Sequence, residues 1–294
     1  MPSLSDHTKI INLLIALGHR TPDLPHSLED IGYTLDYIGV QATLPFGTIC
    51  PDVTFKSYEK NNLLMFEAKS GSVDNEQAER YSKAKPDDLS KQGITSLPAP
   101  KLKFELGYVC TSSNKQKLEE NERQFRWGFP ILVFEDHILR RNGKYAKFKE
   151  RKLDLLFSKG VPFNRTPSYE IFPFGESDSK NWIAFCLLSQ MAQFAAVGKT
   201  RFTEKELVNA CHPLFEYFWR DEKESIYRIT RATMNKLNEM GTQKIIIKKH
   251  ANNEWELLKF DFKKSTAKLL MDVADSVPDT VDIAKFLSGN ESAN

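Results

Sequence analysis

Three charged residues in the first quarter of the chain have types and spacing suited to catalysis. Asp52 follows Pro51, and after fourteen intervening residues Glu67 and Lys69 flank Ala68 at the end of an apolar run. Successive side chains of a β-strand point to opposite faces, so Glu67 and Lys69 would share one face. Two carboxylates supply the hard oxygen ligands that Mg²⁺ prefers. Hydrolysis of a phosphodiester needs such a set, because it requires an activated water, a Lewis acid and stabilised charge on the leaving oxygen.

This arrangement of Pro-Asp followed by Glu-x-Lys resembles the PD-(D/E)XK nuclease family. The resemblance rests on order, spacing and strand context together, because Pro-Asp and Glu-x-Lys are each common by themselves. It implies that Asp52, Glu67 and the main-chain carbonyl of Ala68 hold a metal ion, Mg²⁺ with Mn²⁺ able to substitute. It also implies that Lys69 orients or helps to deprotonate the attacking water.

Gln77 and Tyr81 form a second feature, four residues apart on a predicted helix and therefore on one face of it. A Gln-x-x-x-Tyr at this position resembles an exonuclease-like branch of the same family. The resemblance implies that Gln77 contacts a phosphate or a metal-bound water, and that Tyr81 packs against the DNA backbone. The structural alternative is an exposed glutamine and a half-buried tyrosine. Glu29 is a further candidate for an acidic ligand on the same grounds.

The elements around these residues alternate between helices and strands. Apolar spacing predicts a helix over 6–17, and two short strands over 48–55 and 63–69 are expected to form a hairpin. The segment 33–40 is ambiguous between helix and strand. Later segments read as helices over 74–84 and 115–127, and as strands over 101–111 and 130–139 with a turn at 141–143. This alternation predicts an α/β fold, and the resemblance implies a restriction-endonuclease-like mixed sheet flanked by helices.

The pattern changes between 161 and 180, where Gly and Pro recur without periodicity and a linker is expected. Three helices are then predicted, over 181–197, 203–210 and 225–240, followed by a hairpin of the strands 244–249 and 254–260. Helices followed by a hairpin in this order resemble a winged helix-turn-helix, covering 181–264. The remaining residues, 265–294, are expected to form a helical tail.

Basic residues gather where a winged helix would touch DNA. Between Ile226 and His250, six basic residues face the single acid Glu239, a local charge of +5. In that geometry the third helix enters the major groove and the wing contacts the backbone or the minor groove. The predicted DNA contacts are Arg228, Arg231, Lys244, Lys248 and Lys249. A solvated, charged helix within a protein–protein module is the alternative.

Composition limits the other functions. The net charge of +2, with 27% charged and 40% hydrophobic residues, is typical of a folded soluble protein. The four cysteines are far apart and form no zinc motif, and the six histidines are scattered. No phosphate-binding loop or Rossmann glycine pattern is present, so no nucleotide cofactor is expected. The apolar stretches are too short or too polar to span a membrane, which makes the cytoplasm the default compartment.

We therefore expect a nuclease domain over 1–160 and a winged-helix domain over 181–264. The predicted function is that of a metal-dependent DNA endonuclease in restriction, anti-phage defence or a mobile element. One site cuts one strand, so cleavage of a duplex would require a homodimer or a partner subunit. The alternative is a non-catalytic DNA-binding or assembly subunit that retains the fold. The intact set of Asp52, Glu67 and Lys69 argues against it.

Overall fold

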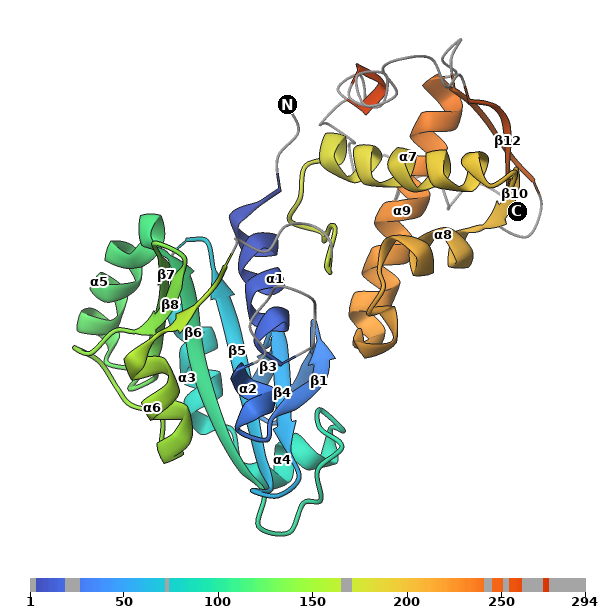
Figure 1. Cartoon of the computed structure of the whole chain (residues 1–294). Coiled ribbons are helices and arrows are strands. Elements are labelled where there is room, and N and C mark those ends of the chain that lie inside the picture. The colour runs from blue at the N-terminus through green and yellow to red at the C-terminus, as the bar shows by residue number, and fades with distance from the viewer. Residues whose placement is uncertain are drawn as a thin grey trace. The chain divides into compact units, whose positions relative to one another are not determined.

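The computed structural model describes residues 4–18, 27–71, 74–164, 171–240, 245–250, 254–260 and 272–274 (Figure 1). The chain divides into two compact units. The first, here called the sheet unit, contains Ser5–Pro173 and His212–Ile226. The second, here called the helical unit, is built mainly from Phe174–Cys211 and the residues from Tyr227 onward. The change from one unit to the other after Pro173 falls inside the predicted linker, but the return of His212–Ile226 to the sheet unit was not predicted.

The sheet unit contains a seven-stranded mixed sheet in the order β1-β4-β5-β6-β7-β8-β9. Only the pairs β5/β6 and β6/β7 are parallel, and the other neighbours are antiparallel. The strands are β1 (Thr34–Ile38), β4 (Val53–Ser57), β5 (Asn62–Lys69), β6 (Lys103–Thr111), β7 (Ile131–Glu135), β8 (Ile138–Arg141) and β9 (Val161–Pro162). A separate small hairpin joins β2 (Ala42–Leu44) to β3 (Gly47–Ile49). The predicted α/β class and mixed sheet are confirmed.

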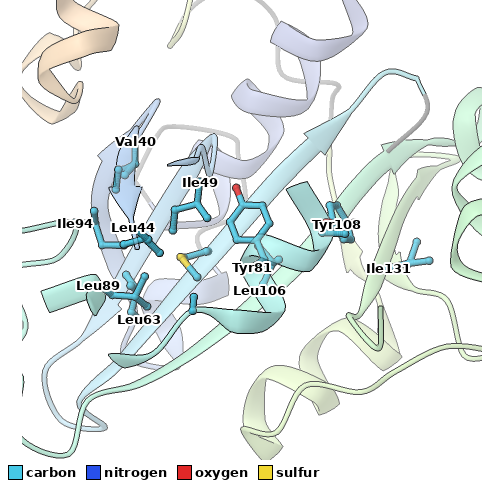
Figure 2. Packing of buried hydrophobic residues seen from close by; sticks show 14 of the residues in the cluster. Val40, Leu44, Ile49, Leu63, Tyr81, Leu89, Ile94, Leu106, Tyr108 and Ile131 are labelled. Atoms are coloured by element: carbon cyan, nitrogen blue, oxygen red, sulfur yellow. The ribbon is translucent and has the colours of Figure 1, made fainter. Parts of the chain in front are cut away.

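Helices cover both faces of this sheet (Figure 1). The helices of the unit are α1 (Asp6–Gly18), α2 (Ser27–Asp30), α3 (Asn75–Lys83), α4 (Pro86–Lys91), α5 (Lys115–Phe125) and α6 (Arg151–Lys159). Leu63 and Met65 of β5 belong to a buried cluster with residues of α3, α4 and α5 (Figure 2). The alternate residue Phe66 packs edge-on against Phe55 and against Phe157 of α6. Because side chains alternate along a strand, the face of β5 that carries Leu63 and Met65 also carries Glu67 and Lys69.

Several predicted elements match the observed ones within a few residues, and two do not. The segment 48–55 is broken at Cys50–Asp52 into β3 and β4 instead of forming one strand. The strand predicted over 130–139 is the β7–β8 hairpin, and its turn lies at Asp136 and His137, not at 141–143. Both turn residues have positive φ, +48° and +60°. Two left-handed residues make the tight hairpin turn that usually contains glycine, and with no glycine at these positions no turn was expected there.

In its described residues, the helical unit combines the helices α7, α8 and α9 with a three-stranded antiparallel sheet in the order β10-β12-β11. Its elements are α7 (Lys180–Ala196), β10 (Arg201–Thr203), α8 (Glu204–Cys211), most of α9 (Arg220–Met240), β11 (Ile245–Lys249) and β12 (Glu254–Phe260). The predicted capping box is present, because Thr203 N donates to Glu206 Oε2 and Glu206 N donates to Thr203 Oγ1. The predicted hairpin is confirmed, whereas β10 was not predicted. Most of the tail at 265–294 lies outside the described residues.

Among the described residues, no helix has the length and apolar character needed to cross a bilayer.

Candidate active site

Asp52 sits where the main chain enters β4, and hydrogen bonds hold it against β5. Its amide donates to Phe66 O at 2.9 Å, and its carboxylate oxygen Oδ2 accepts from Ala68 N at 2.7 Å. On the other side, Gly39 N donates to Asp52 O at 2.7 Å. The main chain on both sides therefore fixes the position of this carboxylate.

Glu67 and Lys69 meet at the carboxyl end of β5, on one face as the strand alternation predicted. Lys69 Nζ lies 2.9 Å from Glu67 Oε1, and both side chains are largely buried. The carboxylates of Asp52 and Glu67 interact electrostatically across the β4–β5 pair. Two carboxylates and a lysine are thus gathered where β4 begins and β5 ends, at one end of these two interior strands.

Helix α3 closes the site through the two residues that its spacing singled out. Gln77 bridges the pair, because Lys69 Nζ donates to Gln77 Oε1 and Gln77 Nε2 donates to Glu67 Oε1, both at 2.9 Å. Tyr81 donates its hydroxyl to Glu67 Oε2 at 2.6 Å and accepts from Cys50 N at 3.2 Å. Gln77 and Tyr81 share a helix face and both contact Glu67.

The expected contact of Tyr81 with a DNA backbone needs correction. Tyr81 is 1% exposed and is packed in the core cluster that Figure 2 shows. A side chain buried to this extent cannot lie against a DNA backbone, because its ring faces protein on all sides. Its hydroxyl instead orients Glu67, which is a role inside the site.

His7 belongs to the site, although its place in the sequence does not distinguish it from the other scattered histidines. It lies in the first turn of α1, and its Nε2 is 3.0 Å from Asp52 Oδ1. Helix α1 is held by Asn12, whose side chain is fully buried, donates to Phe172 O and accepts from Phe172 N. His7 and Asp52 are 45 residues apart in the chain, so no local pattern could have paired them.

Burial and like charge dominate the electrostatics of the site. Burial of Glu67, followed by the charge of Asp52, raises the pKa of Glu67 to about 7, against the opposing effects of Lys69 and Tyr81. Burial lowers the pKa of His7, but the charge and the hydrogen bond of Asp52 outweigh it, and the pKa of His7 is raised. Two carboxylates this close favour a bound cation or proton, because either one relieves their repulsion.

These donors fit a hard divalent cation held by few protein ligands. Among the described residues, no three His, Cys, Asp or Glu side chains are grouped to hold a metal ion by themselves. Mg²⁺ is commonly held by one or two carboxylates and keeps several of its waters. Asp52 and Glu67 would provide those carboxylates, and the carbonyl of Ala68 would add a main-chain oxygen.

Glu29 lies away from this group. It is in α2, and Gly32, just after that helix, approaches Ser57 and Glu59 at the turn between β4 and β5. Asp52 lies at the opposite end of the same hairpin. Glu29 is therefore not a ligand in this arrangement.

The basic residues predicted to read DNA are partly paired with acids. Arg231 forms a two-pronged contact with the buried carboxylate of Glu204, and Arg228 lies 2.6 Å from Glu176. Both acids lie outside the segment from Ile226 to His250, whose net charge is +5. That charge therefore overstates how basic the surface is. Lys244 is outside the described residues.

Two other lysines, in the β11–β12 hairpin, remain on the surface. Lys248 and Lys249 are both exposed on β11, and Lys249 Nζ lies 3.2 Å from Asn235 Oδ1 and 5.6 Å from the centre of the Trp255 ring.

Comparison with known proteins places the first part of the chain in a family. Residues 6–172 match the MJECL32 domain family, which is more than half of the chain. The chain belongs to that family. The uncharacterised protein MJECL32 of Methanocaldococcus jannaschii is 27% identical over 203 residues, covering 63% of this chain and 44% of that protein. The chain thus spans under half the length of this relative. No solved structure gives a significant match. His7, Asp52, Glu67, Lys69 and Gln77 all lie inside the matched residues.

Proposed function

We propose that this protein is a metal-dependent nuclease that hydrolyses phosphodiester bonds of DNA, with its active site where β4 begins and β5 ends. The observation that carries this proposal is the convergence of Asp52, Glu67, Lys69 and Gln77 from the segment before β4, from β5 and from α3. The side chains of Glu67, Lys69 and Gln77 hydrogen-bond to one another, and the carboxylate of Asp52 accepts from the amide of Ala68, which lies between Glu67 and Lys69. The order and spacing of Pro51-Asp52 and Glu67-Ala68-Lys69 resemble the PD-(D/E)XK nucleases, and the mixed sheet is compatible with their fold.

Each residue has a role that its contacts support. Asp52 and Glu67 would hold a divalent cation, Mg²⁺ or Mn²⁺, which when bound supplies a Lewis acid for the phosphoryl oxygen. Lys69 lies beside Glu67 and would orient the attacking water and offset charge on the phosphate. The side-chain amide of Gln77 hydrogen-bonds to both Lys69 and Glu67 and would hold the two side chains in position. His7 would orient Asp52 from the opposite side or add a nitrogen ligand.

We further propose that the helical unit is a winged helix-turn-helix. The order of a helix, a strand, two helices and two strands, with the first strand pairing to the last, supports this assignment. Because Arg228 and Arg231 are paired with acids, the exposed Lys248 and Lys249 of the hairpin are the better candidates for contacts with phosphate. Replacing both lysines with alanine should weaken duplex binding and reduce its salt dependence. Each phosphate contact releases condensed counterions from the DNA, so the variant should release fewer of them on binding. Unchanged affinity and an unchanged salt slope would assign the unit to protein contacts.

A cleavage panel tests the catalytic proposal. Purified protein would be incubated with supercoiled, linear and single-stranded DNA, and with RNA, in the presence of Mg²⁺ or Mn²⁺. Asp52→Ala should abolish cleavage, whereas Asp87→Ala, which removes an exposed carboxylate from α4, should leave it intact. If wild type and Asp52→Ala behave identically on every substrate, the protein is instead a non-catalytic DNA-binding or assembly subunit.

A further inference from the structure

An aromatic surface lies close to the proposed active site and takes no part in the chemistry described above. Phe125 is the last residue of α5, and its ring lies nearly parallel to that of Trp127, with 14° between the planes and 5.9 Å between the centres. Phe125 is 36% exposed, and Trp127 is half-buried. We call this pair of rings the aromatic ledge.

The ledge is held rigidly by the residues around it. Arg126 ends α5 in the left-handed conformation, with φ of +54°, which brings the two rings to the same side of the chain. The carboxylate of Glu122 accepts hydrogen bonds from Trp127 N and Gly128 N at 3.2 and 3.1 Å. The indole Nε1 of Trp127 donates to Asn75 Oδ1 at 3.0 Å. An aromatic surface fixed in this way loses little conformational entropy when a ligand stacks on it.

The ledge is connected to the proposed active site by short steps. The ring of Tyr108 lies 5.5 Å from that of Trp127, and Lys69 Nζ lies 5.8 Å from the centre of the Tyr108 ring. The Phe125 ring is therefore no more than about 17 Å from Lys69 Nζ along this path. At a rise of about 3.4 Å per nucleotide, that distance is at most about five nucleotides of a stacked strand.

Charge and shape around the ledge point to one kind of ligand. Arg123 and Arg126 are exposed on either side of Phe125 in the sequence. Flat apolar rings flanked by cations are what single-stranded nucleic acid requires, because the bases stack and the phosphates are neutralised. A paired base cannot stack on a side chain without leaving its duplex, so the ledge favours unpaired strands.

We propose that Phe125 and Trp127 form a stacking site for an unpaired base, which makes single-stranded nucleic acid, or a strand end released from a duplex, the substrate class of this nuclease. The proposal rests on the nuclease function proposed above and deepens it. Phe125 supplies the outer ring, and Trp127 supports that ring from behind.

Binding of a fluorescein-labelled oligothymidine, followed by anisotropy in a chelator so that no cleavage occurs, tests the stacking site. Phe125→Ala should weaken binding roughly 5- to 150-fold, the loss expected for one stacked base, and Phe125→Tyr should restore it. Tyr58→Ala is the matched control, because Tyr58 is a more exposed aromatic residue, 62%, in the turn at the far end of β4 and β5. It should leave binding unchanged. An abasic strand should bind wild type as weakly as oligothymidine binds Phe125→Ala.

Three results would overturn the stacking site: no binding of oligothymidine by wild type, equal affinities for Phe125→Ala and Tyr58→Ala, or tight binding of the abasic strand. A separate cleavage assay of the bound strand with Mg²⁺ or Mn²⁺ distinguishes this failure from failure of the nuclease proposal. Base-dependent binding through Phe125 without cleavage of any substrate would keep the stacking site and reject the nuclease. Equal cleavage by wild type and Phe125→Ala would keep the nuclease and reject the stacking site.

Discussion

Removal of the Tyr81 hydroxyl should change the stability of the metal-free protein in a way that depends on pH. In Tyr81→Phe, Glu67 Oε2 loses a hydrogen bond of 2.6 Å, and Cys50 N loses its acceptor. A hydrogen bond to a charged group contributes about 1.5–3 kcal/mol, against about 0.5–1.5 kcal/mol when both partners are neutral. The variant should therefore lose more stability where Glu67 is ionised than where it is protonated.

The pH range follows from the pKa of Glu67. Its value of about 7 in the fold, against 4.5 for an ordinary glutamate, means that the folded chain binds the proton more tightly than the unfolded chain. The metal-free wild type should thus lose stability as pH rises from about 4.5 to 7. The Tyr81 hydrogen bond lowers the pKa of Glu67, so its loss should raise that pKa further. In Tyr81→Phe the decline should continue to higher pH than in the wild type.

Urea unfolding in a chelator, at pH 5 and pH 8.5, measures this effect. Tyr108→Phe is the matched control, because the Tyr108 hydroxyl is buried nearby without a hydrogen-bond partner in the structure. We expect Tyr81→Phe to be destabilised by about 1–2 kcal/mol more at pH 8.5 than at pH 5, whereas Tyr108→Phe should stay close to wild type at both. Equal losses for Tyr81→Phe at the two pH values would refute the assigned coupling between Tyr81 and Glu67.

Three further changes test the packing that supports the site. Asn12→Ala should lower the free energy of unfolding by about 2–4 kcal/mol in urea, because two buried main-chain partners at Phe172 lose their hydrogen bonds; a loss below about 1 kcal/mol would contradict that role. Burial lowers the pKa of His212 to about 3, so the unfolded chain binds the proton first and wild type should lose roughly 2 kcal/mol of stability between pH 6.5 and 4.5. His212→Leu should remove this acid-side decline, and an identical decline in the variant would show that another group causes it. Gly39→Ala should be destabilising by about 1–3 kcal/mol, since φ is +64° and a Cβ would lie 2.6 Å from Cγ and 2.8 Å from Cβ of Glu222; adding Glu222→Gly, which removes both atoms, should recover part of the loss in a double-mutant cycle, and strict additivity would exclude the clash.

The sequence predicted the parts of the site that depend on local geometry. Strand alternation placed Glu67 and Lys69 on one face, and helical spacing placed Gln77 and Tyr81 together, because both patterns act over a few residues. The capping box of α8 was recognisable for the same reason.

The rest of the site depends on contacts between distant segments. His7 contacts Asp52, which is 45 residues away in the chain, and no pattern in the sequence around either residue predicts this contact. Tyr81 is buried in one cluster with residues of the β2–β3 hairpin. This hairpin was not predicted, because the expected strand over 48–55 joined part of β3 to β4. The acidic partners of the α9 arginines, Glu176 and Glu204, come from other parts of the chain, so the charge of the local sequence did not reveal these ion pairs.

The central claim is that Asp52 and Glu67 hold a metal ion while Lys69 acts on water and phosphate, and comparison of two single variants tests it most directly. Mg²⁺ or Mn²⁺ binding by calorimetry and single-turnover cleavage would be measured for wild type, Asp52→Ala and Lys69→Ala. We predict that Asp52→Ala loses both metal affinity and cleavage, whereas Lys69→Ala still binds metal and cleaves on the order of 10²-fold or more slowly. Full cleavage by Lys69→Ala, or undiminished metal affinity in Asp52→Ala, would contradict the account.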